Sequence, residues 1–379
     1  MYSIIPPSLL SAILFLFTVK YGKHFIVDAT VMGSFIAFMC VSDFYGSSKP
    51  IIIPEINSGV FFRPFPTNLH NTVNGIYNIQ DLSYDKCKEC RYTSRNKNST
   101  STPRDVILAC SLGYPTNLEI FVRTLRHSGC KAKCVFLVDS HSYSLIKDEI
   151  RESVYDCGGQ IIPFGNVPQM TKGEKLNYVY IICYEFIIAN FDSIDRVVIA
   201  DMYDTAFQGD PFNYQMEDDK LKIVDEYTDF GSSPGHTNVE WLHQFDPNLK
   251  VESHQIYFCT GYLGGKVTIV YRYLSLFLEY VKLGDQYIDQ GLFNYLYFSG
   301  KLSDYGIEVS PKRTDELIRH TAGLHLDPNT EIGNVKTYDR ITYATVIHHY
   351  YSSHSFINSI LSYCPNICMD NRYQIYPRR

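Results

Sequence analysis

Short apolar runs alternate with amphipathic segments along the chain from residue 105 onward. Four of the runs have the length and composition of buried strands. They lie at 105–110, 134–139, 160–164 and 196–201. Between them, apolar side chains recur at helical spacing over 118–125, 145–154 and 176–187. This alternation predicts an α/β domain with a mostly parallel central sheet and helices on both of its faces.

Local signals predict where several of these elements begin and end. Asn117 has the side chain of a helix N-cap and precedes the first amphipathic segment. Gly158 and Gly159 close the second one. Further along, 256–270 predicts a short strand, a glycine-rich turn and a helix, and 342–352 predicts a buried strand followed by two histidines.

Two carboxylates stand at the end of the fourth predicted strand. Asp201 is its last residue, and Asp204 follows three positions later. In sheets of this kind, ligands bind beyond the carboxyl ends of the strands. Two carboxylates on one turn repel each other unless a cation or donors compensate, and Mg²⁺ or Mn²⁺ prefers oxygen ligands. The pair therefore predicts a divalent-metal site, with a solvated acidic turn as the alternative.

The segment that begins with these carboxylates, DMYDTAFQGDPF (201–212), resembles a segment of a known enzyme class. Together with DVILACSLGY and FVRTLRHSGCKAKCVFLVD upstream, it resembles the GT-A class of nucleotide-sugar glycosyltransferases, in particular glycogenin-like enzymes and their relatives. The resemblance implies a GT-A-like fold and transfer of a hexose from a nucleoside-diphosphate sugar to a hydroxyl acceptor on a glycan, protein or lipid. It also implies Mn²⁺ or Mg²⁺ as cofactor, held by Asp201 and Asp204, where the commonest family motif is DxD without the inserted residue.

The resemblance assigns roles to residues outside the acidic turn. Asp289 and Gln290 match a helix start whose Asp and Gln face the sugar. The alternative for Asp289 is an acidic residue that caps the amino terminus of a helix. Glu226 lies in a family landmark, VDEYTDF, and is a candidate on the acceptor side. His348 matches a metal-ligating histidine. Because His348 and His349 point to opposite sides of an extended chain, only one of them is expected to bind.

Three further residues are implied on the donor side. Lys175 corresponds to a basic residue that relatives use toward the nucleotide or its phosphates, with a solvated lysine at a helix start as the alternative. Gly264 and Gly265 match a glycine segment near the donor sugar, as do Thr260 and Gly261 just before them, and glycine permits close approach of the backbone. The alternative for this pair is an ordinary turn at the start of a helix.

The amino terminus contains two apolar segments, 4–19 and 25–41, separated by Lys20 and Lys23. Each is near the short end of the length that spans a membrane, and Asp28 weakens the second. The positive-inside tendency places the lysines in the cytoplasm and both ends in the lumen. The segments predict a membrane anchor over 1–46, in the Golgi or endoplasmic reticulum. A cleaved signal peptide, a single signal anchor and a buried helix pair are the alternatives.

Residues 47–103 are rich in Pro, Ser, Asn and Thr, which predicts a stem between the anchor and a catalytic domain at 104–355, with a tail at 356–379. The stem carries the glycosylation sequon Asn98-Ser99-Thr100 and the CxxC at 87–90. The chain has 11 cysteines, so structural disulfides in an oxidising compartment are favoured. Half of a zinc site or a redox pair is the alternative for the CxxC.

Charge and motif content exclude several classes of function. The chain of 379 residues has a formal net charge of −6 and no basic stripe, so nucleic acid is not an expected partner. It contains no P-loop, nucleophile elbow or HExxH motif. Two alternatives to a glycosyltransferase stay open: an inactive binding protein that kept the fold, and a metal-independent glycoside hydrolase with paired carboxylates.

Overall fold

The computed structural model describes residues 79–95, 99–167, 169–213, 216, 219–310, 318–320, 330–338 and 340–367. All of them belong to the second of two compact units, Gly59–Arg379. The first unit, Met1–Ser58, lies outside the described residues, and so do both predicted membrane segments. Among the described helices, none has the length and apolar character that crossing a membrane requires.

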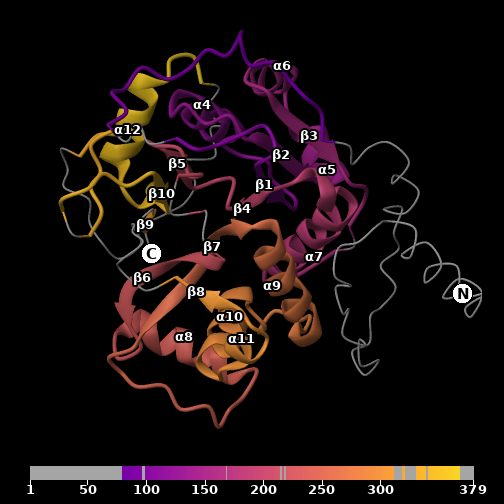
Figure 1. Cartoon of the computed structure of the whole chain (residues 1–379), viewed down its shortest axis with the longest axis vertical. Coiled ribbons are helices and arrows are strands. Elements are labelled where there is room, and N and C mark those ends of the chain that lie inside the picture. The colour runs from indigo at the N-terminus through magenta and orange to yellow at the C-terminus, as the bar shows by residue number, and fades with distance from the viewer. Residues whose placement is uncertain are drawn as a thin grey trace, which may run out of the picture. The chain divides into compact units, whose positions relative to one another are not determined.

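A seven-stranded sheet forms the centre of the described part of the chain (Figure 1). Its strands are β1 (Val106–Ser111), β2 (Lys133–Val138), β3 (Gly159–Pro163), β4 (Arg196–Ala200), β6 (Lys220–Asp229), β7 (Ile256–Lys266) and β8 (Glu308–Val309). They lie in the order β3-β2-β1-β4-β7-β6-β8. Within this sheet, only β7 runs antiparallel to its neighbours. The predicted α/β architecture with a mostly parallel central sheet is confirmed.

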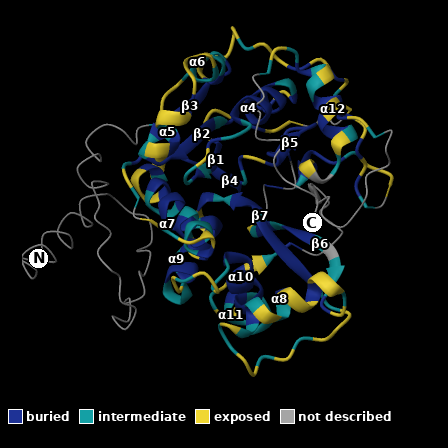
Figure 2. Ribbon diagram, turned by 180° about the vertical axis from the view of Figure 1, so that it is seen from behind, coloured by how far each residue is buried: buried dark blue, intermediate teal, exposed yellow. Residues whose placement is uncertain are grey.

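Alternate side chains of β1 enter two different cores. Ile107 shares one core with Phe121 of α4 (Leu118–His127), and Leu108 shares the other with Phe186 of α7 (Lys172–Asn190). Successive strand residues point to opposite faces, so helices cover the sheet on both sides. Figure 2 shows the central strands buried and the exposed residues on the outer faces of the helices.

The remaining helices are α5 (Ser140–Leu145), α6 (Asp148–Asp156), α8 (Ser233–His243), α9 (Val267–Tyr280), α10 (Asp289–Phe298), α11 (Lys301–Asp304) and α12 (His354–Tyr363), with the 3-10 turns η1 (Phe191–Ser193) and η3 (Tyr350–Ser352). Of these helices, α8, α10 and α11 form the lower part of Figure 1, whereas α6 and α12 lie near its top.

A second, three-stranded sheet lies beyond the carboxyl end of β4. It consists of β5 (Thr205–Phe207), β10 (Val346–His348) and β9 (Ile318–His320), in the order β5-β10-β9. β10 pairs antiparallel with β5, and His348 is the register partner of Thr205. A segment from near the carboxyl end of the chain is thereby held next to the acidic turn.

Three local predictions differ from the structure. The second predicted helix is two short helices, α5 and α6, because Ile146 has an extended backbone between them. Asn117 stands at the N-cap position of α4, as predicted, but its side chain makes no capping hydrogen bond: the residue adopts a left-handed backbone, and its side-chain amide donates to the carbonyl oxygen of Tyr203. Residues 256–266 form one continuous strand and not a strand followed by a glycine-rich turn.

The cysteines of the CxxC form two separate disulfides. Cys87 is bonded to Cys157, and Cys90 is bonded to Cys364. Structural disulfides were favoured over half of a zinc site, and this prediction is confirmed. Further contacts hold the described part of the predicted stem to the sheet domain: Thr100 N donates to Phe212 O over 3.1 Å. The proposed division of the chain into anchor, stem, catalytic domain and tail stays a prediction.

Candidate metal centre

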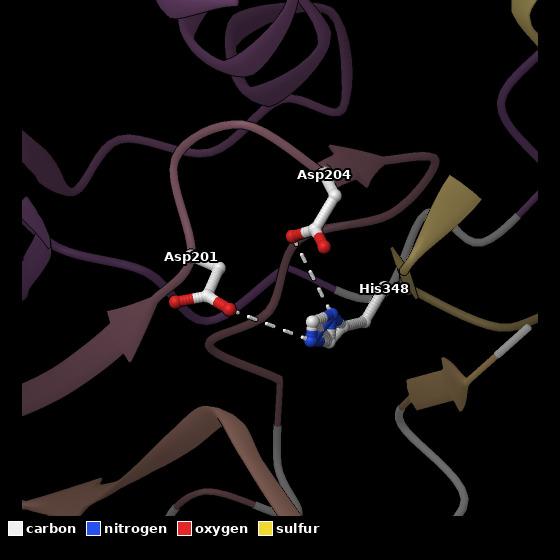
Figure 3. A group of neighbouring side chains, drawn as sticks. All are labelled: Asp201, Asp204 and His348. Atoms are coloured by element: carbon white, nitrogen blue, oxygen red, sulfur yellow. Dashed lines mark ion pairs between the residues drawn. The ribbon is translucent and has the colours of Figure 1, made fainter. Parts of the chain in front are cut away.

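Three side chains converge beyond the carboxyl end of β4 (Figure 3). His348 Nε2 lies 3.9 Å from Asp201 Oδ2, and His348 Nδ1 lies 3.7 Å from Asp204 Oδ1. Each residue offers one ligand atom, and these atoms all lie within 4.8 Å of one another. An ion of the size of Mg²⁺, with ligands at about 2.1 Å, needs opposite ligands about 4.2 Å apart, so small side-chain movements suffice to bind it. The arrangement could hold a divalent metal.

Hydrogen bonds with three other parts of the chain fix the backbone of the acidic turn. Asp201 N donates to Gly261 O of β7 over 2.9 Å, which anchors the start of the acidic turn to the central sheet. Tyr350 N donates to Asp204 O over 3.3 Å, and Tyr350 follows directly after β10, the strand that pairs with β5. The Asn117 amide holds the middle of the turn at Tyr203 O. Both sheets therefore position the cluster.

Two observations indicate that a cation fits this cluster. Asp204 Oδ1 is buried and accepts no hydrogen bond from any other described residue. Buried carboxylate oxygens without a partner are costly, and a metal ion would compensate that cost. In addition, a Cβ on Gly261 would lie 2.8 Å from Asp201 Oδ2 and would overlap the imidazole of His348. Glycine at this position therefore lets the two candidate ligands approach each other beside β7.

The electrostatics of the cluster favour a bound cation. Burial raises the pKa of Asp204 well above its usual range, and the nearby Asp201 carboxylate raises it further. Burial also raises the pKa of Asp201, with a second contribution from Asp289. A divalent cation reverses this effect by stabilising the ionised carboxylates. The Asp201 side chain is 33% exposed, against 1% for Asp204 and 2% for His348, so solvent and ligands reach the cluster from the Asp201 side.

A second polar network lies beside the metal cluster. Thr260, next to Gly261 on β7, donates its hydroxyl to Asp289 Oδ2 over 2.6 Å. Gln290 Nε2 donates to Glu226 Oε1 over 2.9 Å and to Asn238 Oδ1 over 2.7 Å. Burial raises the pKa values of both Asp289 and Glu226, while the hydrogen bonds from Thr260 and Gln290 act in the opposite direction. The network fixes the buried carboxyl group of Asp289 and the half-buried carboxyl group of Glu226.

The structure brings most, but not all, of the predicted site residues together. Asp201, Asp204 and His348 form the cluster, and His349 does not belong to it: its Nε2 contacts the Tyr351 hydroxyl. Lys175 lies at the same sheet edge, because a Cβ on Gly113, just after β1, would be 3.3 Å from Lys175 Nζ.

Gly264 and Gly265 are not at the cluster. They pair with Val198 and Val197 in the middle of the sheet, and a Cβ on Gly264 would meet Met216 Cε at 2.8 Å. Because β7 continues as a strand through residue 266, the pair lies several residues away from the open edge. The glycine that the site requires is Gly261.

Two residues at the site were not among its predicted members. Cys259 is buried in a core cluster, and its Sγ lies 3.8 Å from His348 Nε2. Asn117, at the N-cap position of α4, supports the acidic turn through its side-chain amide. β7 loses its regular register with β6 between Cys259 and Leu263, so strand alternation read from the sequence does not predict that these side chains lie at the site.

Comparison with known proteins gives similarity to solved structures at low sequence identity. No family model matches the chain, and no curated protein sequence matches it. Among solved structures, mouse xyloside xylosyltransferase 1 in its apo form aligns with 11% identity and a TM-score of 0.37. The alignment covers 64% of this chain and 96% of that chain. Similarity at this level leaves the activity to be argued from the geometry of the site.

Proposed function

We propose that this chain is a metal-dependent glycosyltransferase that transfers a hexose from a nucleoside-diphosphate sugar to a hydroxyl group of a glycan, protein or lipid. The observation that carries the proposal is the cluster of Asp201, Asp204 and His348 at the carboxyl edge of a mostly parallel sheet. Sheets of this kind bind ligands at that edge, and an oxygen-rich divalent site suits a diphosphate. The resemblance of the 201–212 segment to GT-A enzymes agrees with it.

The three residues of the cluster are proposed to bind the metal ion that contacts the diphosphate of the donor. Asp204 and His348 are buried and would hold Mn²⁺ or Mg²⁺ from the inner side, while the more exposed Asp201 would hold it from the solvent side. When bound, the cation supplies positive charge that stabilises the departing nucleoside diphosphate. Lys175, at the same sheet edge, adds a second positive charge toward the phosphates.

The network of Asp289, Gln290 and Glu226 serves the sugar and the acceptor. Both donor hydrogens of the Gln290 amide are directed to fixed acceptors, Glu226 and Asn238, which sets the orientation of this side chain. If the anomeric configuration inverts, a base must sit beside the acceptor hydroxyl, and Glu226 and Asp289 are the candidates. If the configuration is retained, no dedicated base is required.

The proposed location is the lumen of the Golgi or endoplasmic reticulum, with the amino-terminal segment as a membrane anchor. Two disulfides among the described residues support an oxidising compartment. Attachment to a membrane rests on the apolar segments 4–19 and 25–41 of the sequence.

The decisive experiment tests binding and turnover with matched variants. A thermal-shift screen of nucleotide sugars with and without Mn²⁺ identifies the donor, since a bound ligand raises apparent stability. Release of the nucleoside diphosphate is then measured for the wild type, Asp201→Ala, Asp204→Ala and the exposed control Asp304→Ala on α11. The expected result is Mn²⁺-dependent release that only the first two variants lose.

Three outcomes would contradict the proposal. Release that survives both cluster substitutions places the chemistry elsewhere. Binding of donor and metal without any turnover indicates a binding protein. Cleavage of a glycoside without metal or nucleotide indicates a hydrolase.

A further inference from the structure

Two exposed tyrosines flank the metal cluster. Tyr203 lies in the acidic turn between Asp201 and Asp204 and is 44% exposed. Tyr351 lies three residues after His348, in η3, and is 40% exposed. Single exposed aromatic side chains are common on protein surfaces, but ligand sites are lined by them. The position of these two beside a candidate metal site therefore calls for a closer look at their surroundings.

The hydroxyl end of Tyr203 is directed to the cluster. It donates a hydrogen bond to the Asp201 carboxylate. The Asp201 carboxylate in turn raises the pKa of Tyr203 more than any other group does, and Tyr351 is among the groups that raise it further. Ionisable groups act on each other mainly over short distances, so the two phenols are neighbours. Because Asp201 is the most exposed member of the cluster, both tyrosines lie on the side that solvent reaches.

Strained backbone positions hold both tyrosines. Four residues other than glycine have a left-handed backbone in the described part of the chain, and Asn117 and His349 are two of them, with φ 64° and 65°. The Asn117 amide donates to Tyr203 O, and His349 Nε2 hydrogen-bonds to the Tyr351 hydroxyl, with the two rings 4.2 Å apart. Such backbone strain clusters at ligand sites, where the surrounding structure maintains it. The fold therefore fixes this pair of rings despite their exposure.

The chemistry of the pair suits a sugar ring. Each tyrosine has an apolar ring face and a polar tip, and a sugar has C–H groups on its faces and hydroxyl groups around its rim. A lipid chain would need a continuous apolar surface, whereas the polar side chains of Asn117 and His349 accompany these rings. A diphosphate bound at the cluster would bring the sugars joined to it to this side of Asp201.

We propose that Tyr203 and Tyr351 form an aromatic subsite that binds a sugar ring joined to the metal-bound diphosphate. The inference rests on the proposed function, which supplies the metal and the diphosphate. A nucleotide sugar has two such rings, the ribose and the hexose, at opposite ends of the diphosphate. Probes that add these rings one at a time distinguish between them.

The test is calorimetric titration of the full-length protein at saturating Mn²⁺. The probes are pyrophosphate, which has no sugar, then UDP, which adds the ribose and base, then UDP-glucose, which adds a hexose; GDP and GDP-mannose form a second pair. The proteins are the wild type, Tyr351→Ala and the control Tyr155→Ala, a tyrosine on α6 that is 39% exposed. Tyr351→Ala should bind pyrophosphate within about twofold of the wild type and a sugar-containing probe about tenfold more weakly, and the control should match the wild type.

Two substitutions at Tyr203 separate its ring from its hydroxyl. Tyr203→Phe keeps the ring and should keep the affinity gained from the sugar, whereas Tyr203→Leu should lose it as Tyr351→Ala does. A loss that begins with the nucleoside diphosphate assigns the ribose, and a loss confined to the nucleotide sugar assigns the hexose.

Three results would overturn the inference. In the first, Tyr351→Ala and Tyr203→Leu bind every probe as the wild type does. In the second, pyrophosphate binding falls by the same factor as the other probes, which means that the tyrosines act on the metal. In the third, the wild type gains no affinity from the sugars of either pair. The proposed function survives the first two results, but it fails together with the inference if the wild type binds neither Mn²⁺ nor any diphosphate.

Discussion

Replacing Gly261 with alanine introduces a methyl group into the space between two candidate metal ligands. The new Cβ would lie 2.8 Å from Asp201 Oδ2 and well under 3.0 Å from His348 Nε2, distances that real Cβ atoms essentially never show. The imidazole must retreat by more than about 1 Å to regain ordinary van der Waals contact. His348 is 2% exposed and belongs to the paired strand β10, so it has little room to do so.

The expected consequence is a large loss of metal affinity. Displacing one ligand, or the residue that orients it, costs on the order of 10–100-fold in affinity, which is about 1.4–2.7 kcal/mol of binding free energy. Calorimetric titration of Mn²⁺ into metal-free protein measures this loss. Circular dichroism and thermal unfolding without metal establish whether Gly261→Ala still folds.

A second glycine substitution serves as the matched control. Gly231 follows β6, and a Cβ there would approach Ser253 at 3.1 Å, a tight contact that lies away from the cluster. Gly231→Ala is expected to lower stability slightly and to leave Mn²⁺ affinity within about twofold of the wild type. The reasoning is refuted if folded Gly261→Ala also binds Mn²⁺ with wild-type affinity, because the position of His348 against Gly261 would then not affect metal binding.

Three further predictions concern pH, a disulfide and the polar network. In metal-free protein, burial raises the pKa of Asp204 in the folded state, so the free energy of unfolding should fall as the pH rises above about 4. Urea titrations between pH 4 and pH 8 measure this fall, and Asp204→Asn should show a smaller one. An equal dependence on pH in both proteins would contradict the prediction. Replacing both Cys90 and Cys364 with serine should cost about 2–5 kcal/mol of stability and should also weaken metal binding, because this disulfide holds the segment that follows His348. The control replaces both Cys87 and Cys157 with serine, which should lower stability without changing metal affinity. Gln290→Glu places a carboxylate against Glu226 where an amide now donates over 2.9 Å, so turnover should drop by at least about tenfold with Mn²⁺ affinity unchanged; wild-type turnover would remove this network from the chemistry.

Interactions between residues close in sequence could be predicted from the sequence. The apolar runs became strands β1 to β4 because a short run of branched and aromatic side chains, buried on both faces, has few other stable conformations. The position of Asp201 and Asp204 at the carboxyl end of β4 followed from the same pattern. The predictions of a capping side chain at Asn117 and of a turn within the 256–266 segment were wrong because the hydrogen-bond partners of these residues lie far away in the sequence.

The resemblance named His348 as a candidate ligand, and the tertiary structure decided that this distant residue, and not His349, completes the cluster. His348 reaches Asp204 because β10 pairs antiparallel with β5, in a register that puts His348 opposite Thr205. Gly261, and not Gly264 or Gly265, borders the site because β7 continues as a strand, so the register with β4 determines which glycine meets Asp201. Strand register depends on the packing of both partners, and a one-residue shift would turn every side chain to the other face. The local sequence determines the strands and the acidic turn, whereas pairing between distant strands determines which side chains meet as candidate metal ligands.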